Sequence, residues 1–295
     1  FNLTDADLDQ VTTTGTLTVG ATTNTGGITI GTDGAVTQGS KNVIFVTGGS
    51  LAIGANNLTS SGNVTLTADA DSNGSGSIST GVGVVGTGTV IASAAQGIDL
   101  KLNATVFNAT NTTSGNVTVT DTGTLDLSGV TQSGGNLSIT TTGALSDSGT
   151  VTVSGTTTLA VGAGNDIVLN HGSNNFQGVV EITSANDVTL VDANALDLGA
   201  SVVTGNLNVT TTGALSDSGT VVVTGTTTLA VGAGNDIVLN DAGNDFQGTV
   251  TITTVRDATL AAAGALDLGV STISGNLTVT AGGAISDNGA ISVTN

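Results

Sequence analysis

One segment of this chain is written twice, seventy residues apart. The thirty residues from Thr141, "TTGALSDSGTVTVSGTTTLAVGAGNDIVLN", recur from Thr211 as "TTGALSDSGTVVVTGTTTLAVGAGNDIVLN", and only two positions differ. A third copy begins at Ala281 with "AGGAISDNGAISVTN". Self-similarity at a fixed period is the signature of a repeat architecture, in which each unit buries its apolar face against its neighbours. The chain is therefore predicted to be an array of stacked units.

Within each copy, apolar residues alternate with polar ones, which is the period of a half-buried strand. In "ALDLG", Leu196 and Leu198 are expected to point inward and Asp197 outward, and in "DIVLN" Ile167 and Leu169 are expected inside. Thr and Val are branched at Cβ and favour strands over helices. The chain has no Pro, which would remove a donor from a strand ladder, and its 45 Gly suit sharp corners.

Glycines divide one copy into pieces of 20, 23 and 27 residues that start at Gly205, Gly225 and Gly248. Each piece is too short to bury its own apolar face and is expected to form one coil. The predicted fold is all-β, a right-handed parallel β-helix (β-solenoid) of about 12 or 13 coils, with a 70-residue super-repeat of three coils. Two sets of acids three coils apart are then expected to line one face each. They are Asp126, Asp197 and Asp267, and Asp147, Asp217 and Asp287.

A single solenoid domain is expected over residues 1–295. Diverged coils are predicted for 1–114 and regular 70-residue repeats for 115–295. The opening residues 1–11, "FNLTDADLDQV", are predicted to form an N-terminal cap or a junction through Phe1, Leu3 and Leu8. A chain that starts on Phe suggests a mature or excised protein.

Charge narrows the range of partners. The net charge is −19, and the only bases are Lys41, Lys101 and Arg256. Such a surface repels phosphate, so neither nucleic acid nor an anionic membrane is expected as a partner. No run of eighteen apolar residues is present, so membrane insertion is not expected either. Divalent cations, neutral glycans and proteins remain as partner classes.

One acidic loop has the spacing of a calcium site. In "DADSNGS", Asp69, Asp71, Asn73 and Ser75 place oxygen ligands at alternate positions, and Gly74 allows a sharp bend. The twelfth position of such a loop is Thr80, where a bidentate Glu is usual. Two interpretations therefore stand, a calcium site on these four residues or a solvated acidic loop.

Other motifs have structural explanations. "GVGVVG" from Gly81 matches a dinucleotide fingerprint but lacks the following helix, so its glycines are expected in turns. "VGAGNDIVL" from Val161 resembles one calcium-binding nonapeptide, but its copies are too far apart to share ligands, so a corner turn is expected. The single histidine, His171, occupies the place that Asp241 takes in the next copy. A lone histidine and three scattered bases do not form a catalytic cluster, so the chain is predicted not to be an enzyme.

Several phrases carry a resemblance to a known family. They are "LTDADLDQVTTTGTLTVG", "AGNDIVLNDAGNDFQGTVTIT" and "GNLTVTAGGAISDNGAISV". In their order within a 70-residue unit they resemble the filamentous haemagglutinin-type β-helix proteins of Gram-negative bacteria, which include two-partner-secretion and giant adhesins. The resemblance implies a secreted or cell-surface β-solenoid with adhesion or fibre functions, and it supplies no catalytic residues.

The function expected from these features is structural. The first hypothesis is the shaft or repeat region of a bacterial surface adhesin, which contacts a host or neighbouring-cell glycan or protein. The alternative is a subunit that self-associates end to end into a filament, matrix or surface layer, because the ends of a β-helix are open strand edges. Continuation of the coils within a longer chain is the third arrangement expected for such an edge.

Overall fold

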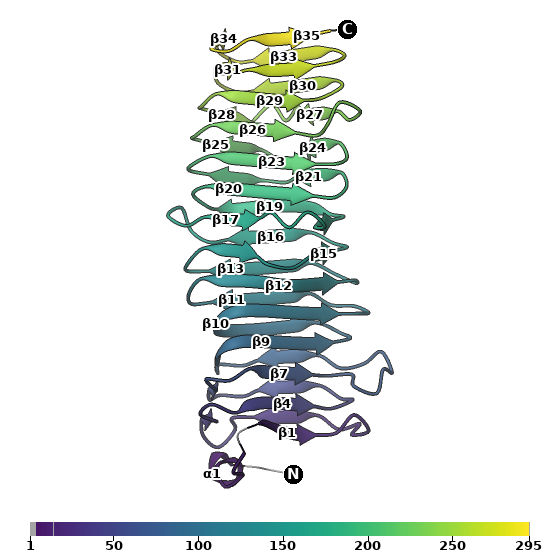
Figure 1. Cartoon of the computed structure of the whole chain (residues 1–295), viewed down its shortest axis with the longest axis vertical. Helices are drawn as coiled ribbons and strands as arrows, with labels where there is room; N and C mark the ends of the chain where they lie inside the picture. The colour runs from purple at the N-terminus through teal and green to yellow at the C-terminus, as the bar shows by residue number, and fades with distance from the viewer. Residues whose placement is uncertain (1–3, 14, 295) are drawn as a thin grey trace. The chain divides into compact units, whose positions relative to one another are not determined.

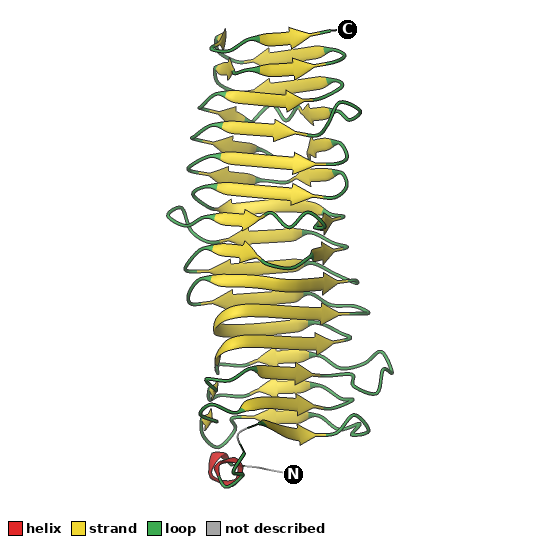
Figure 2. Ribbon diagram, in the orientation of Figure 1, coloured by secondary structure: helices red, strands yellow, loops and turns green. Residues whose placement is uncertain are grey.

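The computed structural model describes residues 4–13 and 15–294. They fall into two compact units that meet between Thr142 and Gly143 in the sequence. In each unit the strands pair in parallel with strands one coil away, and in each the strands nearer the viewer run rightward as the chain climbs (Figures 1 and 2). Such coils are right-handed, the usual hand for parallel crossovers. Both units are β-solenoids with about 13 turns between them, which confirms the predicted fold class.

The first unit contains the one helix of the described residues (red in Figure 2) and a series of short strands. Its elements are α1 (Asp5–Asp9), β1 (Thr16–Gly20), β2 (Ile28–Ile30), β3 (Val36–Thr37), β4 (Asn42–Val46), β5 (Leu51–Ile53), β6 (Leu58–Thr59), β7 (Val64–Thr67), β8 (Ile78–Thr80), β9 (Val85–Ala94), β10 (Ile98–Asn111), β11 (Val117–Asp121), β12 (Leu125–Gln132) and β13 (Leu137–Thr141). Alternate residues of these strands point inward, and Phe45 and Phe107 are almost wholly buried among Leu, Ile and Val.

The helix α1 forms because the residues before and inside its first turn satisfy its free backbone groups. Thr4 is the N-cap, and its side chain and that of Asp7 make the reciprocal bonds of a capping box. Asp5 Oδ1 accepts the backbone N–H of Thr37 at 2.7 Å, and the apolar side of the helix buries Leu8. The helix lies within residues 1–11, for which a cap or a junction was predicted, and Phe1 and Leu3 lie outside the described residues.

The regular secondary structure in the described residues of the second unit consists of strands. They are β14 (Leu145–Asp147), β15 (Val151–Val153), β16 (Thr157–Ala160), β17 (Ile167–Leu169), β18 (Asn175–Phe176), β19 (Val179–Ser184), β20 (Val188–Asp192), β21 (Leu196–Leu198), β22 (Ser201–Val203), β23 (Leu207–Thr211), β24 (Leu215–Asp217), β25 (Val221–Val223), β26 (Thr227–Ala230), β27 (Ile237–Leu239), β28 (Asp245–Phe246), β29 (Val250–Thr254), β30 (Ala258–Ala262), β31 (Leu266–Leu268), β32 (Ser271–Ile273), β33 (Leu277–Ala281), β34 (Ile285–Asp287) and β35 (Ile291–Val293).

Two long ladders run through this unit, one on each side of the coil interior. The ladder called here the first face joins β14, β17, β20, β23, β26, β29 and β31. The ladder called the second face joins β16, β19, β21, β24, β27, β30 and β33. The chain alternates between the two ladders, and other short strands pair outside them, β22, β25 and β28 as a separate three-stranded sheet and β32 with β35 as a two-stranded sheet.

The register of these ladders corrects the predicted three coils per repeat. On the first face Ile167 pairs with Val188, which leads through Leu207 to Thr227, so three turns take sixty residues. Ile237, the counterpart of Ile167 in the next copy, lies half a turn further on and pairs with Leu215 on the second face. A 70-residue copy therefore spans three and a half turns.

The error came from the 27-residue piece that starts at Gly248. It was expected to be a single coil, but it contains β29, β30, β31 and β32 and passes from the first face to the second and back to the first, which is one and a half turns. The expectation that Asp197 and Asp267 line one face is wrong for the same reason: Asp197 lies on the second face and Asp267 on the first.

The coil interior follows the alternation read from the sequence. The side chains of Leu196, Leu198, Ile167 and Leu169 are fully buried, as predicted. Burying a large aliphatic side chain contributes roughly 1.5–3 kcal/mol, and every coil repeats this contribution on both faces. Stacking of identical inward rows is therefore what holds the unit together.

Candidate functional site

The predicted calcium residues all lie in one loop between β7 and β8. Asp69 has a positive φ of 58°, and its Oδ1 accepts the backbone N–H groups of Gly74 and Ser75 at 3.0 and 3.2 Å. The amide nitrogen of Asn73 donates to Asp71 Oδ2 at 2.8 Å, and its oxygen accepts the backbone N–H of Ser75. The four side chains are thus brought together, and they hold the shape of the loop through bonds to one another.

The ligand set that these residues offer is short for a hard cation, which prefers six to eight oxygens. Thr80, at the twelfth position, points into the coil, where its hydroxyl accepts the N–H of Lys101 at 2.9 Å. No group of three or more His, Cys, Asp or Glu side chains placed to hold a metal occurs in residues 4–13 and 15–294. Calcium binding by this loop stays a prediction, which calorimetric titration with Ca²⁺ would decide.

The repeated acids of the second unit brace turns. Asp147 accepts the backbone N–H of Asn170 at 2.8 Å and the side-chain amide of buried Asn174 at 2.6 Å. Asn174 in turn accepts the N–H of Val151 at 2.8 Å. The next copy builds the same arrangement from Asp217 and Asn244. These carboxylates accept hydrogen bonds from the backbone and from Asn side chains of the neighbouring coil, so their role is structural.

His171 takes part in the same turn. Its Nδ1 lies 3.3 Å from the hydroxyl of Thr150 and accepts the backbone N–H of Ser173 at 3.3 Å. In the next copy Asp241 Oδ1 makes both equivalent contacts, with Thr220 and with Gly243. A ring nitrogen and a carboxylate oxygen are interchangeable here because the turn needs only an acceptor.

Two buried carboxylates were not predicted from the sequence. They are Asp121 in the first unit and Asp192 in the second. Asp192 accepts the N–H groups of Phe176 and Asn194, and Asp121 those of Ala104 and Gly123. Burial raises the pKa of both carboxyls, and these backbone bonds offset part of that rise. The signal for them was present, because the alternation in "VTLVD" points Asp192 inward.

All three bases are bound to groups of their own unit. Lys41 Nζ donates to the Leu8 carbonyl at 3.3 Å, and Lys101 Nζ donates to the Gly81 carbonyl. Arg256 pairs with Asp236 and, at 3.1 Å, with Asp257. The pKa of Asp257 is lowered, first by the backbone N–H of Asn276 and further by the guanidinium.

The remaining motifs lie largely in turns, but Gly86 of "GVGVVG", which was expected in a turn, lies within strand β9. In "GVGVVG" the N–H of Gly81 bonds to the Ile53 carbonyl, and strand β9 follows where a nucleotide site needs a helix. In "VGAGNDIVL" Gly162 has a φ of 84°, which suits a corner, and Asp166 accepts the side chain of Asn186 at 2.9 Å. Both motifs shape the course of the backbone around the coil.

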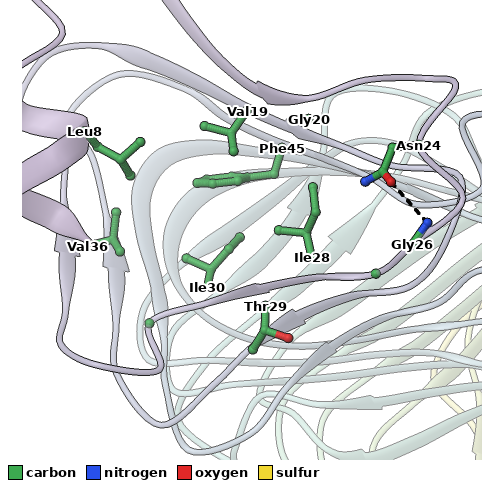
Figure 3. Close-up of a pocket in the computed structure, with 12 residues that line it drawn as sticks. Leu8, Val19, Gly20, Asn24, Gly26, Ile28, Thr29, Ile30, Val36 and Phe45 are labelled. Carbon is green, nitrogen blue, oxygen red and sulfur yellow. Dashed lines mark hydrogen bonds between the residues drawn. The ribbon is translucent and has the colours of Figure 1, made fainter. Parts of the chain in front are cut away.

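A cavity of about 480 Å³ lies beneath α1 in the first unit (Figure 3). Leu8, Val19, Ile28 and Phe45 point into it, and Asn24 at its edge accepts the N–H of Gly26 at 3.1 Å. Its walls combine aliphatic side chains with backbone and contain no acid or base. The cavity lies between the small helix and the side chains of the first coils.

The outward rows of the second unit are uncharged over several coils. On the first face the stacked outward residues are Val168, Thr189, Asn208, Thr228 and Thr251. On the second face they are Ser216, Val238, Thr259 and Thr278. A chain of charge −19 thus keeps neutral hydroxyl, amide and methyl groups along these two rows, although Asp197 stacks next to Ser216 on the second face, and it places acids such as Asp147 and Asp166 at the turns.

This geometry defines the class of protein: a β-solenoid repeat protein in which several acids and the single histidine accept hydrogen bonds from the chain's own backbone. The family model described as "Repeats of unknown function (DUF5649)" matches residues 114–183, 185–253 and 255–295. The chain belongs to this family. Its three matched segments follow the 70-residue period, and neither curated proteins nor solved structures give a significant match.

Proposed function

We propose that the chain is a non-enzymatic structural protein outside the cell, the shaft or repeat region of a bacterial surface adhesin or fibre. The observation that carries the proposal is the use of its polar side chains. Asp147, Asp217 and His171 brace turns, while the stacked outward rows that run from Val168 to Thr251 and from Ser216 to Thr278 are neutral. A solenoid of this kind holds its surface rigidly and at a fixed spacing, which suits display and contact along its sides.

The resemblance to filamentous haemagglutinin-type proteins supports a location at the surface of a Gram-negative-type cell. No helix within residues 4–13 and 15–294 is long and apolar enough to span a membrane. The partner expected for the neutral rows is a glycan or a protein on a host or neighbouring cell. The acids at the turns disfavour nucleic acid and anionic lipid.

The test is binding by the purified chain to intact cells and to a glycan array, with the first 142 residues as a matched fragment. Saturable binding that depends on the outward rows, and is lost when Asn208 and Thr228 are both replaced by Asp, supports the proposal. Hydrolysis of a polysaccharide by the chain, or its recovery from the cytoplasm of the source cell, contradicts it.

Self-association into a filament or matrix is the second candidate. It is favoured by the main-chain ladders and the rows of Leu, Ile and Val that repeat from coil to coil. A coil presented by another molecule can make the same bonds. Fibres in electron micrographs of the purified chain support this candidate, and monodisperse particles at high concentration reject it.

A further inference from the structure

Equivalent outward residues of successive repeat copies lie on opposite faces of the coil. Outward residues of the copy 143–212 form a stacked row on the first face, namely Ser146, Val168, Thr189 and Asn208. Their counterparts seventy residues later form a stacked row on the second face, namely Ser216, Val238, Thr259 and Thr278. The same surface is therefore shown twice, to opposite sides.

The cause is an odd number of half-turns. Each copy passes along one of the two ladders seven times, as β14, β16, β17, β19, β20, β21 and β23 do in the copy 143–212. A chain that alternates between two faces reaches the opposite face after an odd number of passes. The repeat of the sequence is 70 residues, but the repeat of the displayed surface on one side is two copies. At about 4.8 Å per coil, equivalent residues in neighbouring copies are separated by about 17 Å along the axis and by the full thickness of the coil.

We infer that each 70-residue copy ends half a turn out of phase with its start, because it spans three and a half turns. The number of copies therefore sets the face on which all later coils display their outward residues. Adding or removing one copy reverses that side, and adding or removing two restores it. The inference rests on the strand register alone and holds whether or not the chain is an adhesin.

The first test counts how many bulky labels bind at once. The chain has no cysteine, so introduced thiols can be biotinylated selectively. In N208C/T278C the two labels lie on opposite faces, about 17 Å apart along the axis. In the control V168C/T251C they lie on the same face, four coils or about 19 Å apart. Monovalent streptavidin is far wider than either spacing, so N208C/T278C should bind two molecules and the control one, as counted by native mass spectrometry.

The second test removes one copy. Joining Asn170 to Asp241 deletes seventy residues and leaves the local sequence "DIVLNDAGNDFQ" intact. Thr251 then takes the place of Glu181 on the face opposite Val168, and Thr278 takes the place of Asn208 on the same face as Val168. The V168C/T251C pair should change from one bound streptavidin to two, and V168C/T278C from two to one.

A register measurement keeps the inference falsifiable if the shortened chain does not fold. In the full chain Thr259 pairs with Thr278, so T259C/T278C should be joined by a short bifunctional maleimide. T251C/T278C, the pair required by a 27-residue coil, should remain unlinked. Linkage of T251C/T278C in place of T259C/T278C overturns the inference, as does one bound streptavidin on N208C/T278C.

Discussion

The two complete copies of the second unit, residues 143–212 and 213–282, differ mostly on the outside. Inward residues such as Phe176 and Phe246 are the same, and both are almost wholly buried. Outward, Glu181 is replaced by Thr251 and Asn186 by Arg256. The inward set must fit the coil above and the coil below, whereas an outward side chain needs only to tolerate water. Packing therefore fixes one face of each strand and leaves the other free to change.

Inward positions also differ, as at Ala185/Val255, Val188/Ala258 and Val203/Ile273, but these exchange one aliphatic side chain for another. A different kind of change occurs at one buried position. Asp192 lies inside its coil and accepts the N–H groups of Phe176 and Asn194, and its counterpart is Ala262. The fold thus accepts either a hydrogen-bonded carboxylate or a methyl group at the same buried corner. Each copy is therefore a natural control for substitutions made in the other.

The largest effect is expected from the buried phenylalanines. F176A and F246A should each lower the free energy of unfolding by about 3–5 kcal/mol, because each leaves a cavity in a closely packed coil. The measurement is denaturant unfolding followed by circular dichroism, with V168A as an exposed control that should change the free energy by less than about 0.5 kcal/mol. Unequal losses in the two copies would show that their interiors are not equivalent.

A gain in stability is expected at Thr227. Its hydroxyl is buried and makes no hydrogen bond, as is also true of Thr157 in the other copy. T227V keeps the shape of the side chain and removes a buried unpaired polar group, whose cost is about 1–3 kcal/mol. The melting temperature should rise, while T228V on the outward side should leave it nearly unchanged. A loss of stability in T227V would show that the hydroxyl has a partner in solution.

The buried carboxyl should make stability depend on pH. Burial raises the pKa of Asp192 in the folded chain above its unfolded value, so the ionised form destabilises the fold at neutral pH. This penalty should disappear as the pH falls through the folded pKa toward the unfolded value near 4. The stability of the natural chain relative to D192N should therefore increase as the pH is lowered.

The reciprocal change is A262D, which should add the same pH dependence to the other copy. Urea unfolding of the three proteins between pH 7 and pH 4 provides the comparison. A difference between the natural chain and D192N that stays constant over this range would contradict a raised pKa.

The smallest effect is expected from the exposed ion pairs of Arg256. R256N copies the residue of the other repeat and removes the contacts to Asp236 and Asp257. The side chains are open to water, so the loss should be slight at low salt and absent in high salt, where such pairs are screened. The reciprocal N186R should give a slight gain beside Asp166 and Asp187, with the same salt dependence. An effect that persists in high salt would show that Arg256 acts by packing.

Much of the fold could be read from the order of the residues. Alternation placed Leu196 and Ile167 inside and Asp197 outside, and the glycine turns separated the strands. The number of turns in a copy could not be read in this way. Gly248 begins a piece with four short strands, and nothing in its local pattern tells a single three-sided coil from one and a half two-sided coils.

The candidate site was predicted in part. The residues of the "DADSNGS" loop do lie together, but the inward direction of Thr80 depends on the coil that contains it. The braces formed by Asp147 and Asn174 could not be predicted, because the partners are 27 residues apart in sequence and meet only when neighbouring coils stack. The family match places residues 114–295 among repeats of one kind and leaves the role of their surface to experiment.

The sequence by itself determined that this chain forms strands, which side of each strand is apolar, and that its units repeat every seventy residues. These properties depend on local preference and on alternation, which act over a few neighbouring residues. Only the tertiary structure decided that a copy makes three and a half turns and that Asp197 and Asp267 face opposite ways. The reason is physical: strand pairing joins residues about twenty positions apart, and the register of each pair depends on how both coils close around their shared interior.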